Sequence, residues 1–323
     1  MKRGFFAMTV SLVALMAASP AVIAQNYPAK AVRVIIPWPP GGSNDITGRI
    51  VLQKVAENVG QQFVIDNRGG AAGTIGADMV AKSPPDGYVV MVHSTTHITN
   101  AHLYKKLPYD TLKDFIGVTA LAKMVGVLVV HPSMPAKSVK ELLAIAKARP
   151  DQVIYGSSGN GSFVHMAMAL LTSMSNTKMV HVPYKGGGPA SIAIASGEIQ
   201  AMIPTIGSVL TQVQAKRVRP LAVTSDTRVK VLPDVPTIAE AGVPGYEFTS
   251  WVGAFVPANT PRPIVDRLNA EFKKALEHPD VVKKLSDQTL DPLYMTPEQF
   301  AARLRSDFEK HAKLVKLTGA KVD

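Results

Sequence analysis

The side chains best suited to hold a ligand are concentrated in four short segments rich in glycine. Each segment follows an apolar stretch and precedes a stretch with the apolar spacing of a helix. A helix N-terminus carries unpaired N–H groups and a partial positive charge, so each segment is a candidate seat for a carboxylate or a phosphate. The four segments are residues 38–45, 68–74, 156–162 and 183–188.

The elements that position these segments alternate between strand and helix. Residues 32–37 have the pattern of a buried strand, and a helical apolar stripe then runs to about Asn58. Similar units begin with strands at residues 62–66, 153–155 and 179–182. The alternation predicts an α/β fold with mostly parallel sheets flanked by helices. Ligands bind outside the carboxyl ends of such strands, where the four segments would lie, two in each of two lobes.

The rest of the chain is predicted to add further strands and helices around these units. The extended segments are residues 88–93, 116–130 with a break near Lys123, 219–224 and 246–256. Helices are predicted from Ser138, over residues 261–276 and 281–285, and from Thr296. Ser138 with Glu141, and Thr296 with Gln299, have the spacing of capping boxes.

The N-terminus has the composition of an export signal. A basic start precedes an apolar run over residues 5–18, and Val22-Ile23-Ala24 is a small-residue cleavage pattern before Gln25. The alternative is a retained membrane anchor over residues 4–24, which is long enough to span a bilayer. Cleavage is the favoured interpretation because of Pro20 and the cleavage pattern, and it predicts a mature protein in the periplasm.

The composition limits the classes of function. Of 323 residues, 46% are hydrophobic and 18% are charged, which provides enough apolar material for real cores. The absence of cysteine excludes disulfides, thiolate metal sites and cysteine nucleophiles. The net charge of +11, or +9 once Lys2 and Arg3 leave with the signal, favours anionic partners. Because the basic residues are scattered without interleaved aromatic residues, binding of nucleic acid is a poor interpretation.

Catalytic motifs fit the sequence less well than anion binding. The glycines of residues 68–76 lack the dinucleotide-binding spacing, and no segment has the phosphate-loop pattern. A nucleophile elbow needs a glycine where Asn160 stands. Ser157 and Ser158 nevertheless leave an exported serine hydrolase open as an alternative.

Several conspicuous side chains have an ordinary structural explanation. His93 and His97 are predicted at a strand end, where their spacing does not place them together as metal ligands. Asp45 in the first turn of a helix compensates the helix dipole. Trp38 either stacks on a flat ligand or closes the wall of the cleft, and both interpretations stay open. We expect neither a metal nor a cofactor.

With these residues assembled, the chain resembles the substrate-binding receptors of tripartite tricarboxylate transporters, also called Bug-type periplasmic receptors. The resemblance covers essentially the whole mature chain and is specific because of the order of its motifs. The second segment departs from the proline and Gly-Ala-Gly-Gly order common in the family. The motifs are Pro37-Trp38-Pro39-Pro40-Gly41-Gly42 with Asp45 and Arg49, Asn67-Arg68-Gly69-Gly70-Ala71-Ala72-Gly73, Leu107-Pro108-Tyr109-Asp110, Gly156-Ser157-Ser158-Gly159-Asn160-Gly161-Ser162, Val182-Pro183-Tyr184-Lys185-Gly186, and Pro236-Thr237 before Gly242.

The resemblance implies a two-lobed periplasmic binding protein of type II that closes over a small carboxylate and involves no catalysis. It implies hinge strands that cross near residues 120–126 and 246–252. The implied partners are the carboxylate and the large and small permease subunits of a transporter, with the receptor a monomer. A protein that senses its ligand and signals to a membrane partner is an alternative. The implied parts are a signal peptide of residues 1–24, one lobe of residues 25–123 and 250–323, and another of residues 124–249.

The resemblance also implies which residues contact the carboxylate, through main-chain N–H groups, hydroxyls and ordered waters. Gly42 would allow close approach of the backbone. The sequence does not name the carboxylate. The first lobe would contribute Trp38, Ser43, Asn44, Asp45, Gly73, Thr74 and His97, and the second lobe Ser157, Asn160, Ser162, Tyr184, Lys185 and Gly187.

Overall fold

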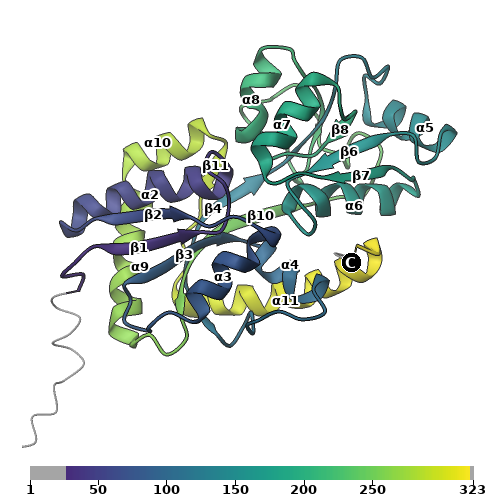
Figure 1. Cartoon of the computed structure of the whole chain (residues 1–323). Helices are drawn as coiled ribbons and strands as arrows, with labels where there is room; N and C mark the ends of the chain where they lie inside the picture. The colour runs from purple at the N-terminus through teal and green to yellow at the C-terminus, as the bar shows by residue number, and fades with distance from the viewer. Residues whose placement is uncertain (1–26, 321–323) are drawn as a thin grey trace, which may run out of the picture.

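Two twisted sheets, each flanked by helices, form the two lobes of the protein (Figure 1). The computed structural model describes residues 27–320. The strand order is β11-β4-β10-β3-β1-β2 in the first lobe and β7-β6-β8-β5-β9 in the second. This architecture confirms the predicted two-lobed α/β fold, but each sheet is mixed and not mostly parallel as predicted. The predicted signal peptide and its cleavage site lie outside the described residues.

The first sheet combines a parallel and an antiparallel part. β1 pairs in parallel with β2 and β3, whereas β10 runs antiparallel to β3 and β4. Val34 and Ile35 are both buried although they point to opposite faces, so both faces of this sheet are covered. The strands are β1 (Val32–Ile36), β2 (Phe63–Asn67), β3 (Val89–Ser94), β4 (Phe115–Val125), β10 (Thr249–Pro257) and β11 (Leu290–Pro292).

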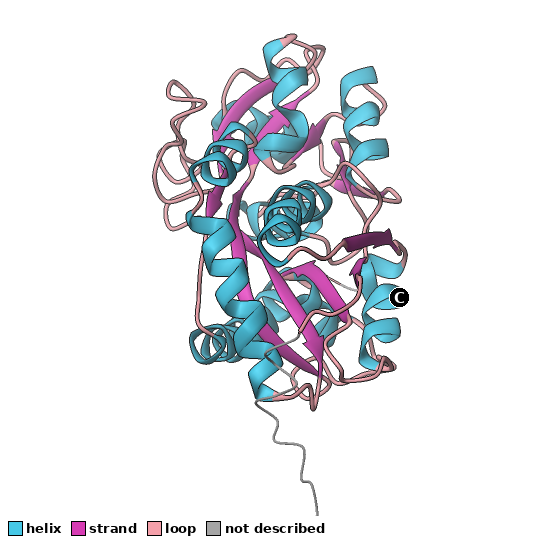
Figure 2. Ribbon diagram, turned by 90° about the vertical axis from the view of Figure 1, so that its left-hand side faces the viewer, coloured by secondary structure: helices cyan, strands magenta, loops and turns pink. Residues whose placement is uncertain are grey.

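Helices on both faces bury this sheet (Figure 2). One core lies between Val34 of the sheet and the helices α2 (Ser43–Val59), α9 (Arg262–Glu277) and α10 (Pro279–Asp287). Another core lies between Ile35 and the helices α3 (Thr74–Ala81), α4 (Thr96–Leu103) and α11 (Pro297–Thr318) on the opposite face.

The second lobe has its own continuous core. β6 pairs in parallel with β7 and β8, and β5 runs antiparallel to β8 and β9. Its strands are β5 (Val127–Val130), β6 (Ile154–Ser157), β7 (Val180–Pro183), β8 (Ala201–Met202) and β9 (Arg219–Val223), and its helices are α5 (Val139–Ala148), α6 (Phe163–Ser175), α7 (Gly187–Ser196) and α8 (Ile206–Gln214).

The two lobes are joined by extended segments that cross side by side. β4 continues into β5 through Gly126, and the return path leads from Thr224 toward β10. Gly126 N donates to Thr224 Oγ1 at 2.8 Å, and Thr224 N donates to Gly126 O at 3.0 Å. The predicted division of residues 116–130 into two strands is confirmed, but the break lies at Gly126, because β4 stays paired with β10 past Lys123 as far as Val125. The lobe boundaries at residues 123–124 and 249–250 stay a prediction.

All four predicted strand–turn–helix units are present, as β1–α2, β2–α3, β6–α6 and β7–α7. A 3-10 turn, η1 (Ala71–Gly73), precedes α3. The sequence missed α4 and α8 and the short strands β8 and β11. Thr296 and Gln299 form a complete capping box, whereas Glu141 accepts from Lys137 N instead of closing the box on Ser138.

The last helix contacts both lobes. α11 packs on β4 and α4 of the first lobe, while Leu314 and Val315 near its end pack against the core of the second. Ser173 Oγ on α6 donates to Leu317 O at 3.3 Å. Within residues 27–320, no helix is both long and apolar enough to cross a membrane.

Candidate functional site

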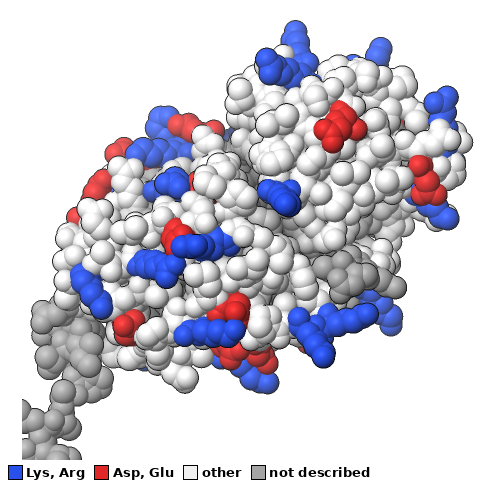
Figure 3. Space-filling model, in the orientation of Figure 1, with Lys and Arg blue, Asp and Glu red and all other residues white. Residues whose placement is uncertain are grey.

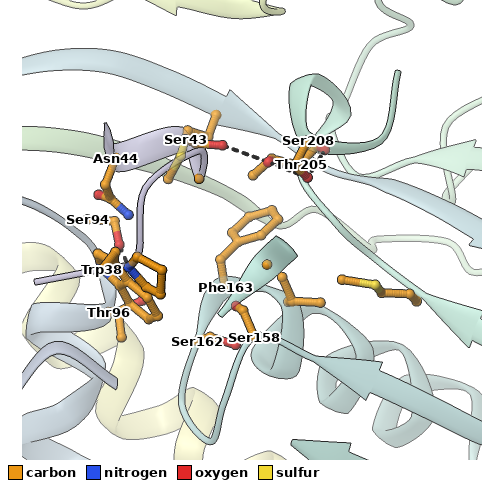
Figure 4. A pocket seen from close by; sticks show the side chains of 16 residues that line it. Trp38, Ser43, Asn44, Ser94, Thr96, Ser158, Ser162, Phe163, Thr205 and Ser208 are labelled. Carbon is orange, nitrogen blue, oxygen red and sulfur yellow. Dashed lines mark hydrogen bonds between the residues drawn. The ribbon is translucent and has the colours of Figure 1, made fainter. Parts of the chain in front are cut away.

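Two adjoining cavities lie between the lobes, where the four glycine segments meet. Trp38, Pro39 and Ser158 line both cavities and form the neck between them. The inner cavity (Figure 4) is lined by Trp38, Pro39, Gly42, Ser43, Asn44, Ser94, Thr96, Met124, Ser158, Ser162, Phe163, Val164, Gly187, Met202, Thr205 and Ser208. The outer cavity is lined by Trp38, Pro39, Pro40, Asn67, Gly69, Gly70, Ala71, Ala72, Tyr104, Ser158, Gly159, Asn160, Tyr184, Lys185 and Gly186.

Most of the predicted contact residues line these cavities, and five lie behind the walls. The nine that line a cavity are Trp38, Gly42, Ser43, Asn44, Asn160, Ser162, Tyr184, Lys185 and Gly187. The five that do not are Asp45, Gly73, Thr74, His97 and Ser157. Direct contact with a ligand stays a prediction for all of them, and the positions of the last five indicate supporting roles.

Asp45 supports the first segment from beneath. Its side chain is 3% exposed and accepts from Gly41 N at 2.9 Å, Arg49 Nε at 2.9 Å and Asn67 Nδ2 at 3.0 Å. Burial alone would raise the pKa of this carboxyl, but the hydrogen bonds from Arg49, Gly41 and Asn67 outweigh it and lower the pKa. The ionised carboxylate therefore ties the turn before α2 to the end of β2.

Trp38 is held in place by a buried histidine. Its indole Nε1 donates to His93 Nδ1 at 3.3 Å, and Asn67 Nδ2 donates to Trp38 O at 3.0 Å. Gly73 lies directly behind, where a Cβ would stand 2.6 Å from His93 Nε2. The second segment thus supports the wall of the first through His93.

The second segment is strained where it differs from the family pattern. Ala71 and Ala72 adopt φ values of 46° and 51°, in the left-handed region that costs non-glycine residues about 1–2 kcal/mol each. Thr74 Oγ1 donates to Ala71 O, and Asn100 Nδ2 donates to Ala72 O, both at 3.0 Å. These bonds hold the strained backbone of Ala71 and Ala72 in place at the outer cavity. Strained backbone is often found at ligand-binding sites.

The third segment rests on two stacked imidazoles. Ser157 Oγ is 2.6 Å from His181 Nε2, and Gly161 N donates to His165 Nδ1 at 3.0 Å. The two rings lie 4.0 Å apart and nearly parallel. Burial lowers the pKa of His165 to about 3 and that of His181 to about 4, so both rings are neutral at pH 7.

His97 belongs to the apolar core of the first lobe. It is fully buried on α4, and its ring packs against Tyr109, Phe115 and Phe255. Burial lowers its pKa to about 4. No group of three or more His, Cys, Asp or Glu within the described part of the chain has the arrangement of a metal site.

The lobes touch directly at the cleft. Ser43 Oγ and Thr205 Oγ1 are 2.7 Å apart, and Thr205 Oγ1 donates to Ser208 Oγ at 3.1 Å. Gly207, in the first turn of α8, approaches the first lobe so closely that a Cβ there would lie 2.4 Å from Gln288 O. The start of α8 is therefore part of the contact between the lobes.

The sequence did not predict several polar residues of the site, most of which lie outside the four glycine segments. Thr205 is the N-cap residue of α8, and a search for N-cap residues after short strands would have found it. Ser94 and Thr96 lie at and just beyond the end of β3, where polar side chains of a parallel sheet can face a ligand. Ser158 was considered only as a nucleophile, although it lines both cavities while its neighbour Ser157 points inward.

The site offers hydrogen-bond donors almost without charge. Among the described residues, no Asp, Glu, Lys, Arg or His lines the inner cavity, and Lys185 is the one charged side chain on the outer cavity. On the face in Figure 3, Lys and Arg are interspersed with Asp and Glu and form no single large patch. The N-termini of α2, α6 and α7 reach the inner cavity through Ser43, Ser162 and Gly187.

Comparisons with known proteins agree with this architecture. The family described as "Tripartite tricarboxylate transporter family receptor" matches residues 47–319. The "UPF0065 protein in tcbD-tcbE intergenic region" of Pseudomonas sp. strain P51 is 40% identical over 290 residues, which are 90% of this chain and 86% of that protein. "Protein BugT" of Bordetella pertussis is 33% identical, with 93% of each chain aligned. A solved R. palustris protein with adipate is 34% identical with a TM-score of 0.88, and the alignment covers 91% of this chain and 99% of that one.

Proposed function

Because this chain belongs to the tripartite tricarboxylate transporter receptor family, we propose that it binds a small organic carboxylate between its lobes and delivers it to a membrane permease. The observation that carries the proposal is the convergence of helix N-termini from both lobes on one cavity lined with hydroxyl groups. Adipate in the similar R. palustris protein supports a carboxylate as the ligand class. The leader predicted at residues 1–24 supports a periplasmic location.

The donors of the cleft are sufficient for binding in the micromolar range. A charge at one helix N-terminus gains about 0.3–1 kcal/mol, and each hydrogen bond to a charged group adds about 1.5–3 kcal/mol. Several together can reach the roughly 8 kcal/mol of a micromolar complex after the costs of association. A ligand that touches both lobes stabilises the closed form, because those contacts exist together only there.

Calorimetry with a panel of mono-, di- and aromatic carboxylic acids tests binding. Asn44→Ala should weaken the bound acid about tenfold, since Asn44 lies against the inner cavity, while Asn58→Ala on the exposed face of the same helix should have no effect. If none of the acids gives a heat of binding, the proposal is contradicted. Uptake by cells with and without the receptor gene tests delivery to a permease, and a signalling role predicts unchanged uptake.

The hydrogen bond between Ser157 and His181 is the feature that a serine hydrolase would share. Ser157 is fully buried and lines neither cavity, so a substrate carbonyl has no open approach to its hydroxyl. Receptor function therefore has the better support. Ester turnover by the purified protein that is lost in Ser157→Ala would favour the hydrolase instead.

A further inference from the structure

The charged groups around the two cavities limit the charges that a ligand can carry. Among the residues described, neither cavity is lined by an aspartate or a glutamate. A cationic group on a ligand would lose its hydration on entering the cleft and gain no carboxylate in return. Amino acids and other zwitterions are therefore poorly matched to this cleft.

The inner cavity can satisfy one carboxylate with neutral donors. Asn44 is 9% exposed and lines the inner cavity, and within residues 27–320 its side-chain amide makes no hydrogen bond, so its Nδ2 group is available to donate to a ligand. Ser162 Oγ accepts from His165 N, and Thr96 Oγ1 accepts from Ser94 Oγ, which leaves both hydroxyl protons to be donated. Figure 4 shows Asn44 and Thr96 from one lobe and Ser162 from the other around the same space.

A second carboxylate close to the first has no cation to offset its charge. Like charges held a few ångströms apart without a counter-ion disfavour ionisation of both. Lys185 is exposed at the outer cavity, away from the donors of the inner one. Short diacids and triacids are therefore poorly matched to the inner cavity.

The walls beyond these donors are largely apolar and include aromatic rings. Phe163, Met124 and Met202 line the inner cavity, which measures about 70 Å³ and is therefore small. The body of a larger ligand must then pass the neck into the outer cavity of about 790 Å³. The rings of Trp38 and Tyr184 lie there, and Tyr184 directs its hydroxyl to Glu198 Oε1 at 2.7 Å. Such walls favour a planar ring over a hydroxylated chain.

From the uncharged inner cavity and the ring-walled outer cavity, we infer that the ligand is an aromatic monocarboxylate. Its carboxylate lies among Asn44, Thr96 and Ser162, and its ring lies against Trp38. The inference rests on the proposed receptor function and selects one class among the carboxylates that this function allows.

Calorimetry of the purified protein at pH 7 with benzoate, phenylacetate, adipate, malate, citrate and glutamate tests the inference. Benzoate or phenylacetate should bind at least tenfold more tightly than malate, citrate or glutamate, a difference of about 1.4 kcal/mol or more. Equal or tighter binding of adipate, malate, citrate or glutamate would overturn the inference and leave carboxylate binding intact. Absence of binding by all six acids would overturn both.

Two variants locate the carboxylate. Asn44→Leu should weaken the aromatic acid at least tenfold and Lys185→Met should weaken it less, while Asn58→Leu on the exposed face of α2 should change its affinity less than threefold. The melting temperature of each variant shows that it is folded. A tenfold loss in Lys185→Met with little change in Asn44→Leu would place the charge in the outer cavity and overturn the inference.

Discussion

The two sides of the cleft use the same strand–turn–helix unit but support it with different chemistry. In the first lobe, the turn before α2 depends on the ionised carboxylate of Asp45. In the second lobe, the turn before α6 depends on His165 and His181, both of which burial keeps uncharged at pH 7, and His165 Nδ1 accepts from Gly161 N. The same backbone unit can thus be fixed by a charge or by the absence of one, and acid should affect the two sides at different pH values.

The lobes also differ in bulk where they meet. Glycines of the second lobe face larger groups of the first: a Cβ at Gly186 would lie 2.9 Å from Pro39 Cγ, and one at Gly207 would lie 2.4 Å from Gln288 O. The second lobe therefore fits against the first because it lacks side chains at these points.

Adding a side chain at Gly207 should have the largest effect of the variants on ligand affinity. Gly207→Ala places a Cβ against main-chain oxygen and holds the lobes apart, so ligand affinity should fall on the order of 100-fold as the closed form is depopulated. Gly188→Ala is the matched control, because nothing lies within 4 Å of its Cβ position. Calorimetry measures both, and parental affinity in Gly207→Ala would show that this contact does not limit closure.

Removal of the Asp45 carboxylate should have the next largest effect, on the free energy of unfolding. Asp45→Ala removes the acceptor of Gly41 N and Arg49 Nε and one of the two acceptors of Asn67 Nδ2, and the free energy of unfolding should fall by about 2 kcal/mol. Asp266→Ala, which breaks an exposed pair with Arg262, should cost at most about 0.5 kcal/mol. Urea denaturation compares the two variants, and equal losses would contradict a special role of Asp45.

The imidazole support should give the second lobe a distinct pH dependence. The folded pKa of His181 is about 4 and the unfolded value is about 6.5, so below pH 6.5 the unfolded chain binds the additional proton. Stability from this group is complete above pH 6.5 and is lost as the pH falls toward 4. Asp45 affects stability at lower pH. Because its pKa is lowered in the folded protein, its stabilisation is complete above the pKa of the unfolded chain, about 4, and is lost as the pH falls further.

His181→Phe isolates this contribution, since it keeps the stacked ring and removes the titration. The slope of unfolding free energy against pH should flatten by about 1.4 kcal/mol per pH unit near pH 5. Urea denaturation at pH values from 4.5 to 8 measures the slope. The other buried histidines titrate in both proteins, so identical slopes would mean that His181 is charged in the folded state.

Relief of strain in the first lobe should have the smallest effect. Ala72→Gly removes a Cβ at a φ of 51°, and the free energy of unfolding should rise by about 0.5–1 kcal/mol. Ala56→Gly in the regular part of α2 should lower it by about 1 kcal/mol. Thermal unfolding distinguishes the opposite signs, and a loss in Ala72→Gly would show that the turn is not strained.

The parts of the fold that local patterns specify could be predicted from the sequence. A buried strand, a glycine turn and a helical stripe follow one another within a few residues, so the units around Trp38 and Asn160 were found. α4 was missed because its first turn is polar, and tertiary packing around His97 and Asn100 makes it helical. The inward turn of Ser157 and outward turn of Ser158 depend on one residue of register that composition does not reveal.

α11 gives the hinge a mechanical limit. The helix is anchored on the first lobe, while its last turns lie on α6 of the second through Leu314 and the bond from Ser173 to Leu317 O. When one lobe rotates relative to the other about Gly126, the end of α11 must therefore slide along α6. Packed helices slide by about 1–2 Å or, more drastically, by a whole turn of roughly 5.4 Å. The contact between α11 and α6 therefore makes opening of the cleft depend on side chains near the C-terminal end of the chain.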